Sequence, residues 1–124
     1  MDKILNYIDG KLVEPISGNY LDNYNPSTGK VYSLIPDSDK LDVNIAIQAA
    51  KIAFVSWSKT PKQERSNILM NLADTIEKYT DDLIKAESKD NGKPESLAAR
   101  VDIPRAPANI RFFAGAILHD SSQI

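Results

Sequence analysis

The sequence predicts an α+β fold, in which two β-hairpins precede about four α-helices. The first third of the chain consists of short apolar runs separated by turn residues, which is typical of small antiparallel strands. From residue 37 onward, apolar residues recur at three- and four-residue steps, which is the period of an amphipathic helix. We therefore expect a hairpin part, 1–36, and a helical part, 37–124.

The two hairpins are predicted from their turns. An Asp9-Gly10 pair readily takes the two positive φ values of a type I′ turn. The second turn lies within the Asn, Pro, Ser, Thr and Gly residues of 25–29, and Pro36 should end the strand that follows it. The four strands are expected at 6–8, 11–13, 20–24 and 30–35.

Capping residues predict where the first two helices begin. Asp37 or Ser38 can cap a helix over 40–58. Thr60, Pro61 and Gln63 have the spacing of a capping box, with threonine at the N-cap and proline at the first helical position. This second helix should continue to about residue 79. Its expected core stripe is Leu69, Leu72, Ile76 and Tyr79, and its expected solvent face is Lys62, Arg65 and Glu77.

Glycine and proline punctuate the last third of the chain. A third helix over 80–91 should stop at Gly92, which can take the left-handed conformation after a helix. Pro104 and Pro107 each lack an amide N–H and would cost ~3 kcal/mol in a helix interior. We therefore expect a break or kink there, with helical pieces at about 95–102 and 105–119.

Composition excludes several kinds of function. The 124 residues contain no cysteine, so disulfides, thiolate metal sites and a cysteine nucleophile are excluded, and the single histidine, His119, cannot form a histidine cluster. Acidic and basic residues are interspersed and the net charge is −2, which disfavours nucleic acid as a partner. The five glycines form no phosphate-binding loop. We thus expect no catalytic and no cofactor-binding residue in this chain.

Membrane association and secretion are also disfavoured. No apolar run approaches the ~18–20 residues that a bilayer span requires. Charged and apolar residues alternate over 1–7, where a secretory signal would need a continuous apolar segment. The expected compartment is the cytoplasm.

Three strings, in this order and at these separations, carry a resemblance to a known family. They are Asn25-Pro26-Ser27-Thr28-Gly29-Lys30-Val31, Ala49-Ala50-Lys51-Ile52-Ala53-Phe54 with Trp57, and Asp90-Asn91-Gly92-Lys93-Pro94. The ordered set resembles the N-terminal region of the NAD(P)-dependent aldehyde dehydrogenase superfamily. Within it, Val101-Asp102-Ile103-Pro104-Arg105 and Asn109-Ile110-Arg111-Phe112-Phe113-Ala114 look like the branch that oxidises 2-hydroxymuconic and 2-aminomuconic semialdehydes.

The resemblance implies a fold and a function. The chain would be an incomplete portion of the α/β cofactor-binding domain of an enzyme that oxidises a semialdehyde to an acid with NAD or NADP. The family's catalytic cysteine, general-base glutamate and cofactor loop have no counterpart in this chain, so the chain alone should bind no cofactor and be inactive. Its expected partners are the remainder of the enzyme and further copies of itself. The alternative is a stand-alone helical interaction or oligomerisation module.

The resemblance also implies two site assignments. Arg105 matches a position in the substrate tunnel where an arginine pairs with a substrate carboxylate, which suits a guanidinium's two parallel hydrogen bonds. Asp90 matches an aspartate that binds a structural monovalent cation with main-chain oxygens near Asn23 and Tyr24. The alternatives are a surface arginine beside a helix start and a solvated aspartate in a helix-ending turn.

Overall fold

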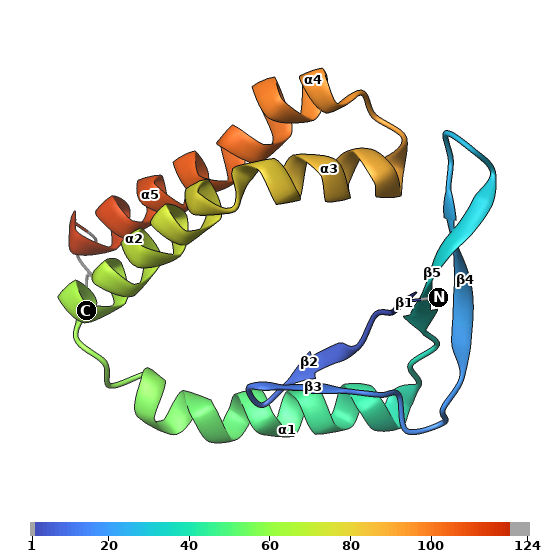
Figure 1. Cartoon of the computed structure of the whole chain (residues 1–124). Helices are drawn as coiled ribbons and strands as arrows, with labels where there is room; N and C mark the ends of the chain where they lie inside the picture. Colours follow the sequence, from blue (N-terminus) through green and yellow to red (C-terminus); the bar gives the residue numbers. More distant parts are fainter. Residues whose placement is uncertain (1, 120–124) are drawn as a thin grey trace. The chain divides into compact units, whose positions relative to one another are not determined.

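The computed structural model describes residues 2–119, and residues 120–124 of the expected helical part lie outside them (Figure 1). Strands come first along the chain and helices follow, which confirms the α+β prediction. The chain divides into two compact units, the first ending at Lys59 and the second beginning at Thr60. The first helix belongs to the unit of the strands, because it contacts the second strand.

The first unit contains two small sheets, and both expected hairpins are confirmed. The strands are β1 (Asp2–Lys3), β2 (Asn6–Ile8), β3 (Lys11–Val13), β4 (Tyr20–Asn25) and β5 (Lys30–Pro36). Strands β2 and β3 form an antiparallel pair, and β1, β5 and β4 form a three-stranded sheet in which β1 is parallel to β5. Strand β1 was not predicted, because two residues carry no periodic pattern.

The turn residues behave as their chemistry predicts. Asp9 and Gly10 have φ values of 52° and 74°, as a type I′ turn requires. In the second hairpin the Asn25 side chain accepts a hydrogen bond from the Ser27 amide at 2.9 Å, and Gly29 has a φ of 67°. Local side-chain chemistry therefore sets both turns.

Helix α1 (Lys40–Trp57) is capped by Asp39, so the prediction of Asp37 or Ser38 as the cap is wrong. Asp39 accepts a hydrogen bond from the Leu41 amide at 2.7 Å, and the Asp42 carboxylate accepts from the Asp39 amide at 3.1 Å. Asp42 is 4% exposed and also accepts from the Ile16 amide at 3.0 Å. The contact of Asp42 with the loop at Ile16 favours the capping box of Asp39 and Asp42 over a cap at Asp37 or Ser38.

The second unit is helical. It contains α2 (Lys62–Lys78), α3 (Thr80–Asn91), α4 (Glu95–Leu97), a π-helix η1 (Ala98–Asp102) and α5 (Ile103–His119). Helices α2 and α5 lie side by side (Figure 1) and contact each other extensively. Gly92 follows α3 with a φ of 78°, which confirms the predicted helix stop. No helix within residues 2–119 combines the length and the apolar character needed to cross a bilayer.

The start of α2 differs from its prediction. Pro61 is the N-cap, with an extended ψ of 145°, and it makes no side-chain capping bond. The proposed arrangement with Thr60 at the N-cap and Pro61 at the first helical position is therefore wrong by one residue. The α-helical conformation begins only at Lys62.

Small residues are the most deeply buried ones on α2 and α5, and the predicted core stripe of α2 holds only for Leu69 and Ile76, which are partly buried. Leu72 and Tyr79 are 46% and 51% exposed, whereas Ala73 and Ala114 are fully buried. Ser66 is also buried, and its hydroxyl donates a 2.7 Å hydrogen bond to the Ala114 carbonyl. Small side chains let the two helix backbones approach closely, so the buried face of α2 is centred on Ser66 and Ala73.

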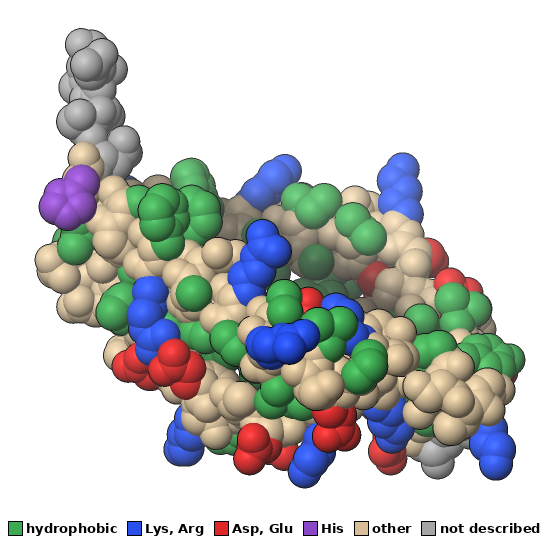
Figure 2. Space-filling model, turned by 90° about the horizontal axis from the view of Figure 1, so that it is seen from above, with side chains coloured by type: hydrophobic (Ala, Val, Ile, Leu, Met, Phe, Trp, Pro, Cys, Tyr) green, Lys and Arg blue, Asp and Glu red, His purple; other side chains and the backbone are tan. Residues whose placement is uncertain are grey.

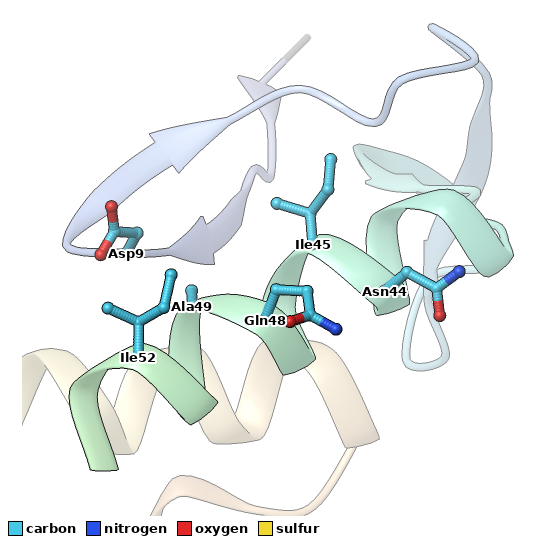
Figure 3. Close-up of a pocket in the computed structure, with 6 residues that line it drawn as sticks. All are labelled: Asp9, Asn44, Ile45, Gln48, Ala49 and Ile52. Atoms are coloured by element: carbon cyan, nitrogen blue, oxygen red, sulfur yellow. The ribbon is translucent and has the colours of Figure 1, made fainter. Parts of the chain in front are cut away.

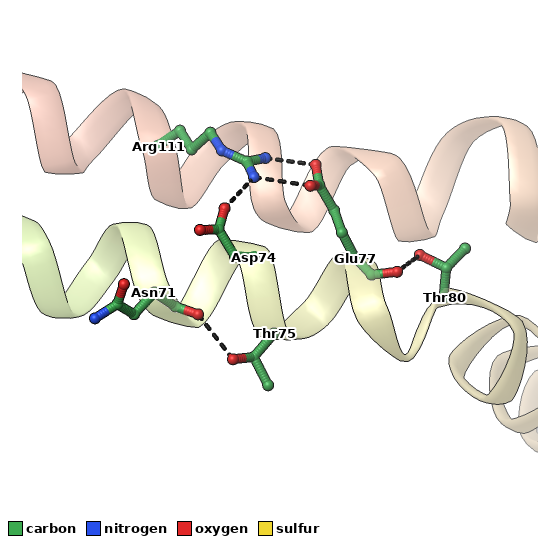
Figure 4. A network of polar contacts seen from close by, with 6 residues as sticks. All are labelled: Asn71, Asp74, Thr75, Glu77, Thr80 and Arg111. Carbon is green, nitrogen blue, oxygen red and sulfur yellow. Dashed lines mark hydrogen bonds and ion pairs between the residues drawn. The ribbon is translucent and has the colours of Figure 1, made fainter.

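Two further features of α2 bear on this face. Arg65, expected in solvent, is partly buried, and its Nε atom is buried. Glu77 is exposed as expected, but Arg111 of α5 binds it through two hydrogen bonds of 2.5 and 2.8 Å and binds Asp74 at 2.7 Å (Figure 4). The hydrogen bond from Arg111 lowers the pKa of Glu77 below its ordinary value.

The expected break or kink near the two prolines corresponds to the π-helix η1, which directly precedes α5. The Ile103 amide donates to the carbonyl of Ala98, five residues back. Helix α5 then runs from Ile103 to His119 with the buried Pro107 inside it, so the second helical piece starts two residues before the predicted residue 105.

Candidate functional site

Arg105, the proposed substrate-binding residue, lies in the first turn of α5, immediately after η1. Its side chain is exposed. Within residues 2–119 it makes no hydrogen bond and no ion pair. An exposed guanidinium without a protein carboxylate is available to an external anion.

A polar cluster lies just before Arg105 and joins the end of α3 to η1. Lys93 donates to the Asp102 carboxylate at 2.6 Å, and its ammonium lies 3.9 Å from a Glu87 carboxylate oxygen. Asn91 donates to Glu87 at 2.6 Å and accepts from the Lys93 amide at 2.8 Å. The four side chains therefore tie the turn at Gly92 to the last residue of the π-helix.

The sequence analysis did not identify the contact between Lys93 and Asp102, although both residues lie in strings that carry the family resemblance. They are nine residues apart, with Pro94, α4 and most of η1 between them. The only signal was a pair of opposite charges downstream of a predicted helix stop, and that signal occurs in many surface segments.

The three proposed cation ligands come from both units. Asp90 lies in the last turn of α3 and is exposed, and Asn23 and Tyr24 lie in β4. Within residues 2–119, no three acidic or histidine side chains gather as metal ligands. The monovalent-cation site stays a prediction.

The segment around Asn23 has an irregular backbone. Asn23 pairs with Ser33 and Tyr24 with Val31, so Tyr32 is an extra residue in the ladder. The side-chain amide of Asn23 donates through Nδ2 to the Tyr32 hydroxyl at 3.0 Å and to the Ser33 hydroxyl at 3.2 Å.

A hollow of about 400 Å³ lies in the first unit, between the β2–β3 turn and α1 (Figure 3). Its lining is mainly apolar, and its residues are Asp9, Asn44, Ile45, Gln48, Ala49 and Ile52. The hollow contains no residue of the proposed substrate or cation sites. It continues an exposed apolar face of α1, where Ile45 and Ile52 are 51% and 74% exposed.

On the visible face of Figure 2, basic and acidic side chains are interspersed with hydrophobic ones. The arrangement agrees with the interspersed charges of the sequence.

Comparison with known proteins places these residues in a family. The sequence model of the aldehyde dehydrogenase family matches residues 12–124. A 2-aminomuconic semialdehyde dehydrogenase of Bos taurus is 50% identical over 118 residues, which are 95% of this chain and 24% of that protein. Acetaldehyde dehydrogenase 2 of Cupriavidus necator is 43% identical over 112 residues, covering 90% of this chain and 22% of that protein.

Solved structures agree with the sequence comparison. An NAD+ complex of aldehyde dehydrogenase from Bacillus cereus superposes with a TM-score of 0.89 at 34% identity, over 92% of this chain and 24% of that one. The chain thus spans about a quarter of the length of the relatives it matches. On the strength of the sequence match and the shared fold, the chain belongs to the aldehyde dehydrogenase family.

Proposed function

We propose that this chain is the N-terminal portion of a cytoplasmic aldehyde dehydrogenase that oxidises a carboxylate-bearing semialdehyde to an acid, with NAD or NADP as hydride acceptor. The observation that carries the proposal is the 50% identity to a 2-aminomuconic semialdehyde dehydrogenase, together with the exposed guanidinium of Arg105, which has no partner within residues 2–119.

In this proposal Arg105 binds and orients the substrate. Its planar guanidinium donates two parallel hydrogen bonds to the substrate carboxylate and fixes the distance from that carboxylate to the aldehyde carbon. The remainder of the enzyme supplies the nucleophile, since these 124 residues contain no cysteine. The proposed monovalent cation, bound by Asp90 and main-chain oxygens at Asn23 and Tyr24, has a structural role.

The residues present do not fit a nicotinamide cofactor site. Gly10, Gly18, Gly29 and Gly92 have positive φ values, but they are spread along the sequence and form no phosphate-binding loop. The cofactor's phosphates would therefore bind to the remainder of the enzyme.

The isolated chain is expected to bind no NAD measurably and to oxidise no aldehyde. The reason is the lack of a nucleophilic cysteine and of a phosphate-binding loop. Calorimetry with millimolar NAD tests this expectation, with the full-length enzyme as the positive control. A saturable Kd below about 100 μM, roughly 5.5 kcal/mol of binding free energy, would reveal a cofactor site within this chain.

The isolated chain is also expected to self-associate. Large apolar residues of α1 are between 43% and 74% exposed, and they are Leu41, Val43, Ile45, Ile47, Ile52, Phe54, Val55 and Trp57. Covering such surface is worth ~25 cal/mol per Å², and patches above a few hundred Å² commonly have a partner. In the parent enzyme the remainder of the chain would cover them.

Light scattering over a tenfold concentration range measures this association. Ile52→Gln should weaken it, whereas Lys51→Gln, at the exposed neighbouring position, should not. A strictly monomeric chain would contradict the prediction. The second candidate function is a stand-alone interaction module. It would be favoured if the chain self-associates and the natural gene product is found to end at residue 124.

A further inference from the structure

Asp102 is placed where it could neutralise Arg105. The two residues are three positions apart, across the junction of η1 and α5, and side chains at that spacing are neighbours on a helix surface. An acidic residue at this spacing would compete with a substrate carboxylate for the guanidinium. Within residues 2–119, however, the two side chains form no ion pair.

The structure shows what Asp102 contacts instead. Its carboxylate accepts a 2.6 Å hydrogen bond from the Lys93 ammonium, and the two side chains are only 30% and 29% exposed. This pair is shorter and less exposed than a typical surface ion pair.

Lys93 is fixed in place by the end of α3. The left-handed Gly92, with a φ of 78°, turns the chain back toward η1. The Asn91 side chain then accepts from the Lys93 amide at 2.8 Å, and the Glu87 carboxylate lies 3.9 Å from the Lys93 ammonium. The turn thus fixes the main chain of Lys93, and the carboxylates of Asp102 and Glu87 hold its ammonium.

We propose that Lys93 is a positioning residue for substrate selection, which holds Asp102 away from Arg105 and so leaves the guanidinium free for a substrate carboxylate. The inference rests on the proposed function, because it assumes that Arg105 binds the carboxylate. Lys93 itself touches no substrate, and its effect is transmitted through Asp102.

The test compares a carboxylate-bearing aldehyde with a neutral aldehyde in the full-length parent enzyme. In Lys93→Met, Asp102 is released to pair with Arg105, so KM for the carboxylate-bearing aldehyde should rise by about two- to tenfold, as expected for competition by a helix-surface ion pair. The kcat for that aldehyde and both constants for the neutral aldehyde should change little.

Two further variants separate positioning from a merely structural role. Lys93→Arg should keep the KM of the unsubstituted enzyme, because an arginine can still bind Asp102. The double variant Lys93→Met with Asp102→Asn should restore KM, because the competing charge is gone. A structural defect would not be repaired by removing a second charged group.

Each outcome either supports or overturns the inference. Equal losses on both aldehydes, an unchanged KM in Lys93→Met, or no rescue in the double variant would overturn it. If Lys93→Met does not fold, Lys93→Gln takes its place, and the same rise in KM and the same rescue by Asp102→Asn are expected. A failure of the proposed function is recognised separately, because Arg105→Gln would then affect the two aldehydes equally.

Discussion

Replacing Arg105 by glutamine in the parent enzyme is expected to lower kcat/KM for a carboxylate-bearing aldehyde by tens- to thousands-fold. Removing one partner of a hydrogen-bonded charge pair that is buried in a complex costs ~2–5 kcal/mol. The loss should be confined to substrates that carry the carboxylate, since a neutral aldehyde makes no use of the guanidinium. Steady-state kinetics with both aldehydes measure the difference.

The chain offers a matched control for this experiment. Arg100 lies in η1, five residues before Arg105, and is also exposed. Arg100→Gln removes the same charge from the same stretch of helix, but at a position with no proposed role. Similar losses in the two variants would indicate a general electrostatic effect, and equal losses of Arg105→Gln on both aldehydes would disprove carboxylate binding.

Ala114→Leu is expected to destabilise the helical unit by ~1–3 kcal/mol. Ala114 is fully buried in α5 and its carbonyl accepts a 2.7 Å hydrogen bond from Ser66 of α2. A leucine side chain there must push the helices apart, which overpacks the interface and strains that hydrogen bond. Urea unfolding of the isolated chain, followed by circular dichroism, should show an earlier transition.

Ala116→Leu is the control for this substitution. Ala116 lies two residues further along α5 and is exposed, so the same added atoms should change stability by no more than about 0.5 kcal/mol. Alanine and leucine have similar helix propensities, so a change in propensity does not contribute to the difference in stability between the two variants. Equal shifts of the urea midpoint at the two positions would mean that α2 and α5 do not pack through their small residues.

The hairpin turns and the helix stop at Gly92 were predictable because their causes are local. Asp9 and Gly10 adopt positive φ values, and Gly92 ends a helix, whatever surrounds them. The ordered motifs that indicated the family are also properties of the linear sequence. The assignments of Arg105 and Asp90 came from that resemblance, and composition alone would not have provided them.

Other features were decided by contacts between residues far apart in the sequence. Asp39 rather than Asp37 caps α1 because its partner Asp42 also binds the Ile16 amide. The buried face of α2 is centred on Ala73 rather than Leu72 because small residues on α5 lie against it. In both cases the periodic pattern permitted several solutions, and the partner segment selected one.

The sequence by itself determined the element types, the hairpin turns, the helix stop at Gly92 and the family motifs, because these depend on residues within a few positions of one another. Only the tertiary structure decided the π-helix before α5, the interface of small residues and the capture of Asp102 by Lys93. These depend on which backbones approach each other and on which charges the turns bring together, and a linear pattern carries neither.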